Sequence, residues 1–145
     1  MARVGLLEDN SRIAKLCATM LHFAGHEVIV YELARECLHA LIPEVTVDVD
    51  SQPSYTPKSI KPCLLPVELL ILDLYLPDIP GLQVLRHLQS CPYTRSLPLI
   101  LCTAAPNRDV VQALRIVPHA TLLEKPFKIQ ALNTAITHAL SSITS

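Results

Sequence analysis

An unbroken apolar run in the middle of this chain ends on a carboxylate. Leu69–Leu72 is apolar throughout, Asp73 follows it, and Pro77 and Gly81 mark a turn soon afterwards. A strand that is apolar on both faces usually lies inside a parallel sheet covered by helices. Ligands of such sheets bind outside the carboxyl ends of the strands. We therefore expect Asp73 to take part in chemistry.

Four further groups that can do chemistry also stand at the ends of apolar runs. Glu8 and Asp9 follow the first run, Thr103 ends the fourth, and Lys125 comes after the fifth. Because the carboxyl ends of parallel strands meet at one edge of a sheet, we expect these groups to lie close to Asp73. Carboxylates in such proximity repel one another unless they bind protons or a cation. Mg²⁺ prefers oxygen ligands and water, so the sequence predicts a magnesium site at this edge.

These groups are the ones that phosphoryl transfer to a protein side chain needs. A carboxylate beside Mg²⁺ can attack phosphorus and form an acyl phosphate, here on Asp73. The oxygens of the transferred group would be neutralised by Mg²⁺, by the Lys125 ammonium, and by the Thr103 hydroxyl with nearby backbone amides. The sequence offers no evident base for hydrolysing an external substrate. We predict a phosphate carrier and no enzyme, with self-phosphorylation and self-dephosphorylation as its only chemistry.

The elements that would position these groups alternate along the chain. Apolar runs typical of strands are Val4–Leu7, Glu27–Tyr31, Val67–Leu72, Leu97–Thr103 and Ala120–Leu123. Helical spacing of apolar residues is found in Ser11–Ala24, Ala34–Leu41, Gly81–Gln89, Arg108–Val117 and Ile129–Leu140. Crossovers between parallel strands are right-handed, so five such units predict an α/β fold with one parallel sheet and helices on both faces. We assign the N-cap of the first helix to Ser11.

One stretch breaks this alternation. Residues 43–66 contain five of the twelve prolines, and proline excludes both a regular helix and a central strand. We interpret residues 1–145 as a single domain with a Pro-rich insert before the third strand, away from the edge that carries Asp73. The insert is either a tolerated surface elaboration or a segment that docks a partner.

Composition argues against several other classes of protein. Half of the residues are hydrophobic, which is enough for the core of one domain. The net charge is −1 and there is no basic cluster, so we expect no direct contact with nucleic acid. No apolar run reaches the length of a membrane span, and the N-terminus lacks the features of a signal peptide. The five cysteines have no C-x-x-C spacing and indicate buried thiols in a reducing cytoplasm.

Taken together, the motifs resemble those of the response-regulator receiver domain of two-component signalling. They are, in the order of that family, Glu8-Asp9, Asp73 with Pro77 and Gly81, Thr103-Ala104, and Lys125-Pro126-Phe127. The resemblance covers the chain apart from the insert. It implies a flavodoxin-like, doubly wound fold of five parallel strands in the order 2-1-3-4-5.

The resemblance also implies the role of each acidic residue. Asp73 would be the phosphorylation site, receiving its phosphoryl group from a sensor histidine kinase or a histidine phosphotransfer protein. Asp73, Asp9 and the backbone carbonyl of Tyr75 would bind Mg²⁺, and Glu8 would act mostly through water. As an inference of our own, the large Tyr75 ring would shield an acyl phosphate from water.

Three further residues bind the phosphoryl group or take part in the switch that the resemblance implies. Thr103 and Lys125 would bind the phosphoryl group, and Thr103 would move toward it. The position of the family's switch aromatic, three residues before Lys125, is occupied by Leu122, so the output step differs from the family pattern. The face made by the fourth helix, fifth strand and fifth helix would bind an output protein, a fused output domain or a second copy of the chain.

Two alternatives stay open. Leu122 would suit a degenerate receiver that serves only as a phosphate-independent interaction module. A Mg²⁺-dependent phosphohydrolase of related topology would also form an aspartyl phosphate, but such enzymes usually carry an acid-base aspartate two residues after the nucleophile. Here that position is Tyr75. No output domain is visible, so we expect either a stand-alone regulator or a part of a longer one.

Overall fold

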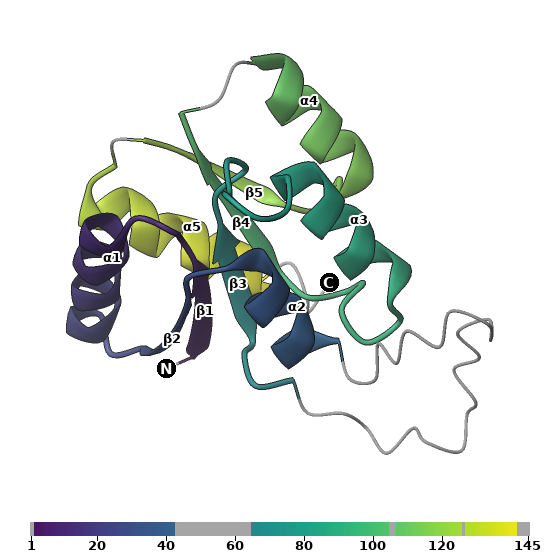
Figure 1. The fold of residues 1–145 in the computed structure, drawn as a ribbon. Helices are drawn as coiled ribbons and strands as arrows, with labels where there is room; N and C mark the ends of the chain where they lie inside the picture. Colours follow the sequence, from purple (N-terminus) through teal and green to yellow (C-terminus); the bar gives the residue numbers. More distant parts are fainter. Residues whose placement is uncertain (1, 43–64, 105–106, 126, 142–145) are drawn as a thin grey trace.

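A computed structural model of the chain describes residues 2–42, 65–104, 107–125 and 127–141, without the side chains of Thr103 and Asn107. In this part of the chain, strands and helices alternate (Figure 1). The strands are β1 (Arg3–Leu7), β2 (Glu27–Tyr31), β3 (Leu69–Leu72), β4 (Leu99–Thr103) and β5 (Thr121–Glu124). The helices are α1 (Ser11–Phe23), α2 (Ala34–Leu41), α3 (Gly81–Ser90), α4 (Asn107–Ile116) and α5 (Ile129–Ser141). Both ends of each of these ten elements lie within two residues of the predicted ones.

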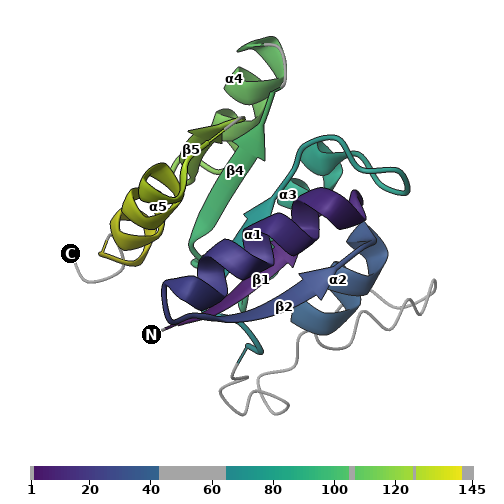
Figure 2. The same ribbon diagram turned by 90° about the vertical axis from the view of Figure 1, so that its left-hand side faces the viewer.

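The strands form one parallel sheet in the order β2-β1-β3-β4-β5, as predicted. Helices α1 and α5 cover one face of this sheet, and α2, α3 and α4 cover the other (Figures 1 and 2). This is the flavodoxin-like, doubly wound arrangement. The predicted insert falls almost wholly on residues 43–64, which lie outside the described residues.

Strand β3 is apolar throughout because both of its faces are covered. Leu70 and Leu72 lie in the core on the α2–α3–α4 side, whereas Leu69 and Ile71 lie in the core on the α1–α5 side. Each of the four is at most 2% exposed. A polar residue within this run would be buried on one face or the other, so the first residue that can reach solvent is Asp73.

The N-cap of α1 is Asn10, and the assignment of this cap to Ser11 is wrong. Asn10 has an extended backbone, and its Oδ1 accepts hydrogen bonds from the amides of Arg12 at 3.0 Å and Ile13 at 3.3 Å. Ser11 is already the first helical residue, so its hydroxyl is one position too late to cap. The correction leaves Glu8 and Asp9 just outside the helix, as the predicted metal site requires.

The β3–α3 loop (residues 73–80) is held on two sides. Asp78 accepts hydrogen bonds from the amides of Ala34 at 3.1 Å and Arg35 at 3.0 Å, so this loop caps the N-terminus of α2. At its far end the amide of Gly81 donates to the carbonyl of Leu74 at 3.0 Å. A Cβ at Gly81 would lie against the backbone of Leu74, so only glycine permits this approach. The position of Asp73 is thereby restrained.

Two composition-based expectations can be compared with the described residues. The thiols of Cys17, Cys37, Cys91 and Cys102 are free and buried, as predicted, while Cys63 lies outside this part of the chain. None of the described helices has the length and apolar character needed to cross a membrane.

Candidate functional site

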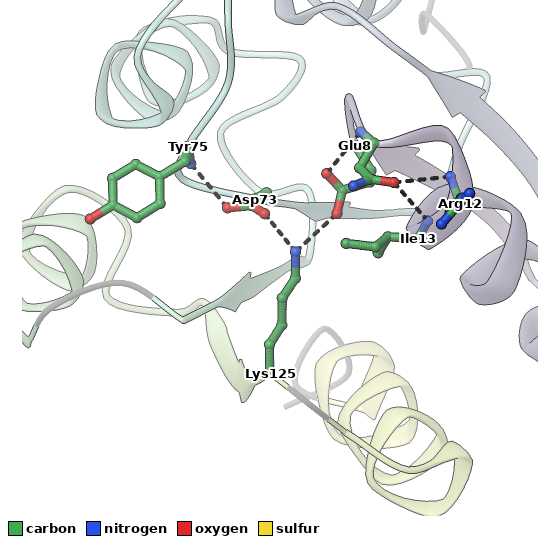
Figure 3. Close-up of polar contacts among 7 residues, drawn as sticks. Glu8, Arg12, Ile13, Asp73, Tyr75 and Lys125 are labelled. Carbon is green, nitrogen blue, oxygen red and sulfur yellow. Dashed lines mark hydrogen bonds and ion pairs between the residues drawn. The ribbon is translucent and has the colours of Figure 1, made fainter.

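The carboxyl ends of β1, β3 and β5 bring together Glu8, Asp73 and Lys125 (Figure 3). Strands β1 and β3 are neighbours with Leu7 opposite Leu72, so the carboxylates that follow these residues are adjacent. Strand β5 is separated from β3 by β4, and Lys125 therefore needs its long side chain to reach across the end of β4. The predicted convergence of these strand ends is confirmed for these three residues.

The ammonium of Lys125 lies between the two carboxylates. Its Nζ donates to Asp73 Oδ2 at 2.6 Å and to Glu8 Oε1 at 2.9 Å. The side chains of Lys125, Asp73 and Glu8 are 18%, 13% and 5% exposed. We call these three residues the ion-pair cluster. Burial by itself would lower the pKa of Lys125, but the hydrogen bonds and negative charges of Asp73 and Glu8 outweigh it and raise that pKa.

Backbone amides orient both carboxylates of the ion-pair cluster. The amide of Tyr75 donates to Asp73 Oδ1 at 3.0 Å, and the amide of Asn10 donates to Glu8 Oε2 at 3.4 Å. Glu8 is the only buried charged residue in the described part of the chain. Burial of a carboxylate is costly unless it is paired, so Lys125 explains how Glu8 is tolerated there. Asp73 is the more accessible carboxylate and the better candidate for reaction.

The predicted gathering of three carboxylates is not seen. Asp9 is exposed on the loop after β1, and in the described ranges no three His, Cys, Asp or Glu side chains are grouped so that they could hold a metal ion. The structure pairs Glu8 with Asp73, and the charge of Lys125 compensates their repulsion. Lys125 can lie between these two carboxylates because only β4 separates β5 from β3, a distance that a lysine side chain spans.

The donors at this edge nevertheless fit Mg²⁺ in their chemistry. Glu8, Asp9 and Asp73 supply carboxylate oxygens, and the loop that carries Tyr75 adds backbone carbonyls, which are the hard ligands that this ion binds together with water. A cation at Asp73 would share that carboxylate with Lys125. The assignment of Glu8, Asp9, Asp73 and the Tyr75 carbonyl as metal ligands stays a prediction.

The side chain of Tyr75 points away from Asp73 (Figure 3). Its hydroxyl donates to Asp109 Oδ2 of α4 at 3.0 Å, and 54% of the residue is exposed. Loss of hydration and the bond to Asp109 raise the pKa of Tyr75. The ring does not cover the carboxylate, so this arrangement does not support the predicted shielding. The sequence contains no signal for the contact with Asp109.

The predicted switch residues lie on β4 and β5. Thr103 is the last residue of β4 and stands opposite Glu124, while its side chain is outside the described ones. Leu122 lies on β5 and is 38% exposed. Pro126 is also outside the described residues, and Phe127 packs against the α1–α5 core. The roles of Thr103 and Leu122 in switching stay predictions.

The thiols nearest the ion-pair cluster are unreactive in character. Burial raises the pKa of Cys17, and it raises the pKa of Cys102 to about 12 although Lys125 acts in the opposite direction. A thiol with so high a pKa is protonated at neutral pH and is a poor nucleophile. Cys102 therefore serves as packing at the end of β4, as expected, and Asp73 remains the candidate nucleophile.

Comparison with known proteins decides the family. The sequence pattern of the response regulator receiver domain matches residues 59–137, which is more than half of the chain. The chain belongs to this family. It is a receiver domain of two-component signalling, and the resemblance inferred from the motifs is confirmed. A comparison with curated protein sequences finds no match.

Solved structures of receiver domains have the same fold. The receiver domain of a signal transduction histidine kinase from Syntrophus aciditrophicus is 22% identical, with a TM-score of 0.72 over 99% of this chain and 92% of that chain. A response regulator receiver domain protein from Clostridium thermocellum is 21% identical, with a TM-score of 0.74 over 99% and 98% of the two chains. The CheY-like receiver domain protein of Methanospirillum hungatei JF-1 is 21% identical, with a TM-score of 0.74 over 98% and 95%.

Proposed function

We propose that this receiver domain accepts a phosphoryl group on Asp73 from a histidine kinase or a histidine phosphotransfer protein. The observation that carries the proposal is the setting of the Asp73 carboxylate. It follows a central strand, is partly exposed, and has the Lys125 ammonium at 2.6 Å on one oxygen and the Tyr75 amide at 3.0 Å on the other. These donors can stabilise negative charge on an incoming phosphoryl group.

In this reaction a carboxylate oxygen of Asp73 attacks the phosphorus atom of a donor phosphohistidine. As the new P–O bond forms, the P–N bond of the donor breaks, and its electron pair stays on the imidazole, which takes up a proton. The Lys125 ammonium can move from the carboxylate to a phosphoryl oxygen that develops charge. Mg²⁺, when bound at this edge, would add positive charge opposite the phosphoryl oxygens.

We propose a carrier of phosphate and no turnover enzyme. Tyr75 occupies the position at which related phosphohydrolases carry an acid-base aspartate, and its hydroxyl donates to Asp109 and points away from Asp73. Mg²⁺ is the cofactor we propose, held by Asp9, Asp73 and the Tyr75 carbonyl, with Glu8 acting through water. We place the protein in the cytoplasm, where kinases of this type act.

The modified domain would then bind an output protein, a fused output domain or a second copy through the α4–β5–α5 face. Two apolar residues of this face, Val111 of α4 and Leu122 of β5, are 48% and 38% exposed. Such side chains suit a surface that binds a partner. Thr103 at the end of β4 would link the phosphoryl group to this face.

Acetyl phosphate with Mg²⁺ tests the proposal. Intact mass should show one added phosphoryl group on the wild type, removable by hydroxylamine as expected of an acyl phosphate. Asp73→Asn should show no addition, while Asp109→Asn, which alters an aspartate of α4, should still be modified. No addition to the wild type, or equal addition to Asp73→Asn, contradicts the proposal.

The second candidate is an interaction module that works without phosphate. It is favoured by Leu122, because leucine cannot make the movement that the family assigns to an aromatic residue at this position. This candidate requires that partner binding be the same for the wild type and Asp73→Asn, with and without acetyl phosphate. A difference between these samples eliminates it.

A further inference from the structure

Tyr75 contacts both Asp73 and helix α4. Its amide donates to Asp73 Oδ1 at 3.0 Å, and its hydroxyl donates to Asp109 Oδ2 at 3.0 Å. Asp109 lies in the first turn of α4 and is 34 positions away from Tyr75 in the sequence. One residue therefore joins the proposed phosphorylation site, where Figure 3 shows its amide on Asp73, to a helix of the proposed binding face.

The N-terminal half of α4 has few other anchors among the described residues. Among the described side chains of this helix, only Ala113 is fully buried. Val117, just after the end of the helix, is also buried. Arg108 and Val111 are exposed, and Asp109 and Val110 are only partly buried. Segments with little buried apolar surface open at low free-energy cost, so the start of α4 is sensitive to the loss of one contact.

A cavity lies where Tyr75 and Asp109 meet. Its volume is about 300 Å³, and it is lined by the segment 74–76, by the segment 80–82 at the start of α3, and by Asp109. Close-packed interiors resist displacement, but a cavity of this size lets the ring or the first turn of α4 shift without disturbing the core. Tyr75 and Asp109, which share the hydrogen bond, both line this space.

We propose that the Tyr75–Asp109 hydrogen bond holds the first turn of α4 in place while Asp73 is unmodified, and that phosphorylation of Asp73 releases it. The inference rests on the proposed function. An acyl phosphate carries nearly two negative charges where the Asp73 carboxylate carried one, and it places new acceptor oxygens beside the Tyr75 amide. If the amide turns toward these oxygens, the hydroxyl moves with the backbone, and a hydrogen bond of 3.0 Å is lost after a shift of well under 1 Å.

This route does not involve β5. Leu122 has neither an aromatic ring nor a hydroxyl, whereas Tyr75 has both and lies two residues from the phosphorylation site. The aromatic residue that responds to phosphate would thus stand in the β3–α3 loop. We call the Tyr75–Asp109 hydrogen bond the tether. Because coupling between two sites is reciprocal, a variant that lacks the tether should also bind a phosphoryl mimic more tightly.

The effect of the tether can be measured as the hydrogen-exchange rate of the amides of residues 111–114, whose helical hydrogen bonds close the first turn of α4. In the unmodified protein, Tyr75→Phe and Asp109→Ala should each exchange these amides about three- to tenfold faster than the wild type, the range expected for one typical hydrogen bond between partly exposed groups. The double variant should exchange no faster than either single variant, since the two changes remove the same contact. Asp109→Asn keeps an acceptor oxygen and should stay close to the wild type.

Saturating beryllofluoride with Mg²⁺, and separately acetyl phosphate, then test the release. Exchange in the wild type should rise to the level of Tyr75→Phe, and exchange in Tyr75→Phe should change little. Equal exchange of the wild type and Tyr75→Phe before modification, or an unchanged wild type after it, overturns the inference. Intact mass of the same samples separates the two failures. A wild type that gains no phosphoryl group overturns the proposed function itself, whereas one that gains it without a response in α4 overturns the tether alone.

Discussion

Replacing Lys125 with methionine tests the physical basis of the ion-pair cluster. Methionine keeps an unbranched apolar side chain for the contacts made by the lysine stem, and it removes the ammonium. Asp73 and Glu8 then lose the cation that lies 2.6 and 2.9 Å from their oxygens. We expect the variant to fold and to be measurably less stable than the wild type.

The size of the effect follows from the distances and exposures. With an effective dielectric constant of about 20, Coulomb's law gives about 6 kcal/mol for each pair before desolvation is subtracted. Exposed ion pairs contribute about 0–1 kcal/mol, and removing one partner of a buried pair costs about 3–5 kcal/mol. Side-chain exposures of 18%, 13% and 5% place the cluster between these cases. We expect Lys125→Met to lower the free energy of unfolding by about 2–3 kcal/mol.

Urea unfolding followed by circular dichroism measures this change. For a slope of about 2 kcal/mol per molar urea, the midpoint should fall by about 1–1.5 M. Lys128→Met is the matched control, because Lys128 is exposed three residues further along and its loss should change stability by less than about 0.5 kcal/mol. Equal midpoints for the two variants would refute the reasoning.

The same pair of proteins gives a pH dependence. The pKa of Lys125 is raised in the folded state, so its contribution is complete below the unfolded value of about 10.4 and is lost as the pH rises through the folded pKa. The stability difference between the wild type and Lys125→Met should be constant from about pH 7 to pH 10 and shrink only above that range. A difference that shrinks between about pH 7 and pH 9 would contradict a raised pKa.

Two substitutions test how the β3–α3 loop is held. Gly81→Ala should destabilise the protein by about 1–3 kcal/mol, seen as a lower Tm, because its Cβ would press on the backbone of Leu74; an unchanged Tm would show that the loop gives way freely. Asp78→Ala removes the cap of α2 and should cost about 0.5–2 kcal/mol in urea unfolding at neutral pH. Burial would raise the pKa of Asp78, but backbone hydrogen bonds outweigh it and lower that pKa, so its contribution is complete above about pH 3.9 and fades below. A deficit of Asp78→Ala that is the same at low and at neutral pH would contradict this assignment.

Burial patterns explain both the accuracy and the errors of the predicted strands. Val67 and Leu97 were included in the third and fourth strands, and both are buried, yet β3 begins at Leu69 and β4 at Leu99. An apolar residue reports that a position is covered, whereas a strand boundary depends on where the ladder of backbone hydrogen bonds begins. The type and order of the elements were therefore predictable, and their ends were uncertain by two residues.

The helix N-caps also show which features the sequence predicts and which depend on the folded structure. Asn10 and Ser11 are both good N-cap residues, and only the backbone conformation decides that Asn10 acts and Ser11 is helical. The cap of α2 comes from Asp78, 44 positions away from Ala34. Local sequence signals cannot indicate a partner at this distance, because the contact exists only once β2, β1 and β3 are assembled in the sheet.

For this protein, the sequence alone determined the parallel α/β fold and the strand end at which Asp73 lies, because a central strand must be apolar on both faces and its first polar residue marks the edge. Tertiary structure decided which groups meet there. Lys125 contacts Asp73 and Glu8 only because a single strand, β4, separates β5 from β3, so that a lysine side chain can span the distance. Likewise, Tyr75 reaches Asp109 because α4 packs beside the β3–α3 loop. Side-chain reach and orientation are properties of the assembled fold, and no spacing along the chain encodes them.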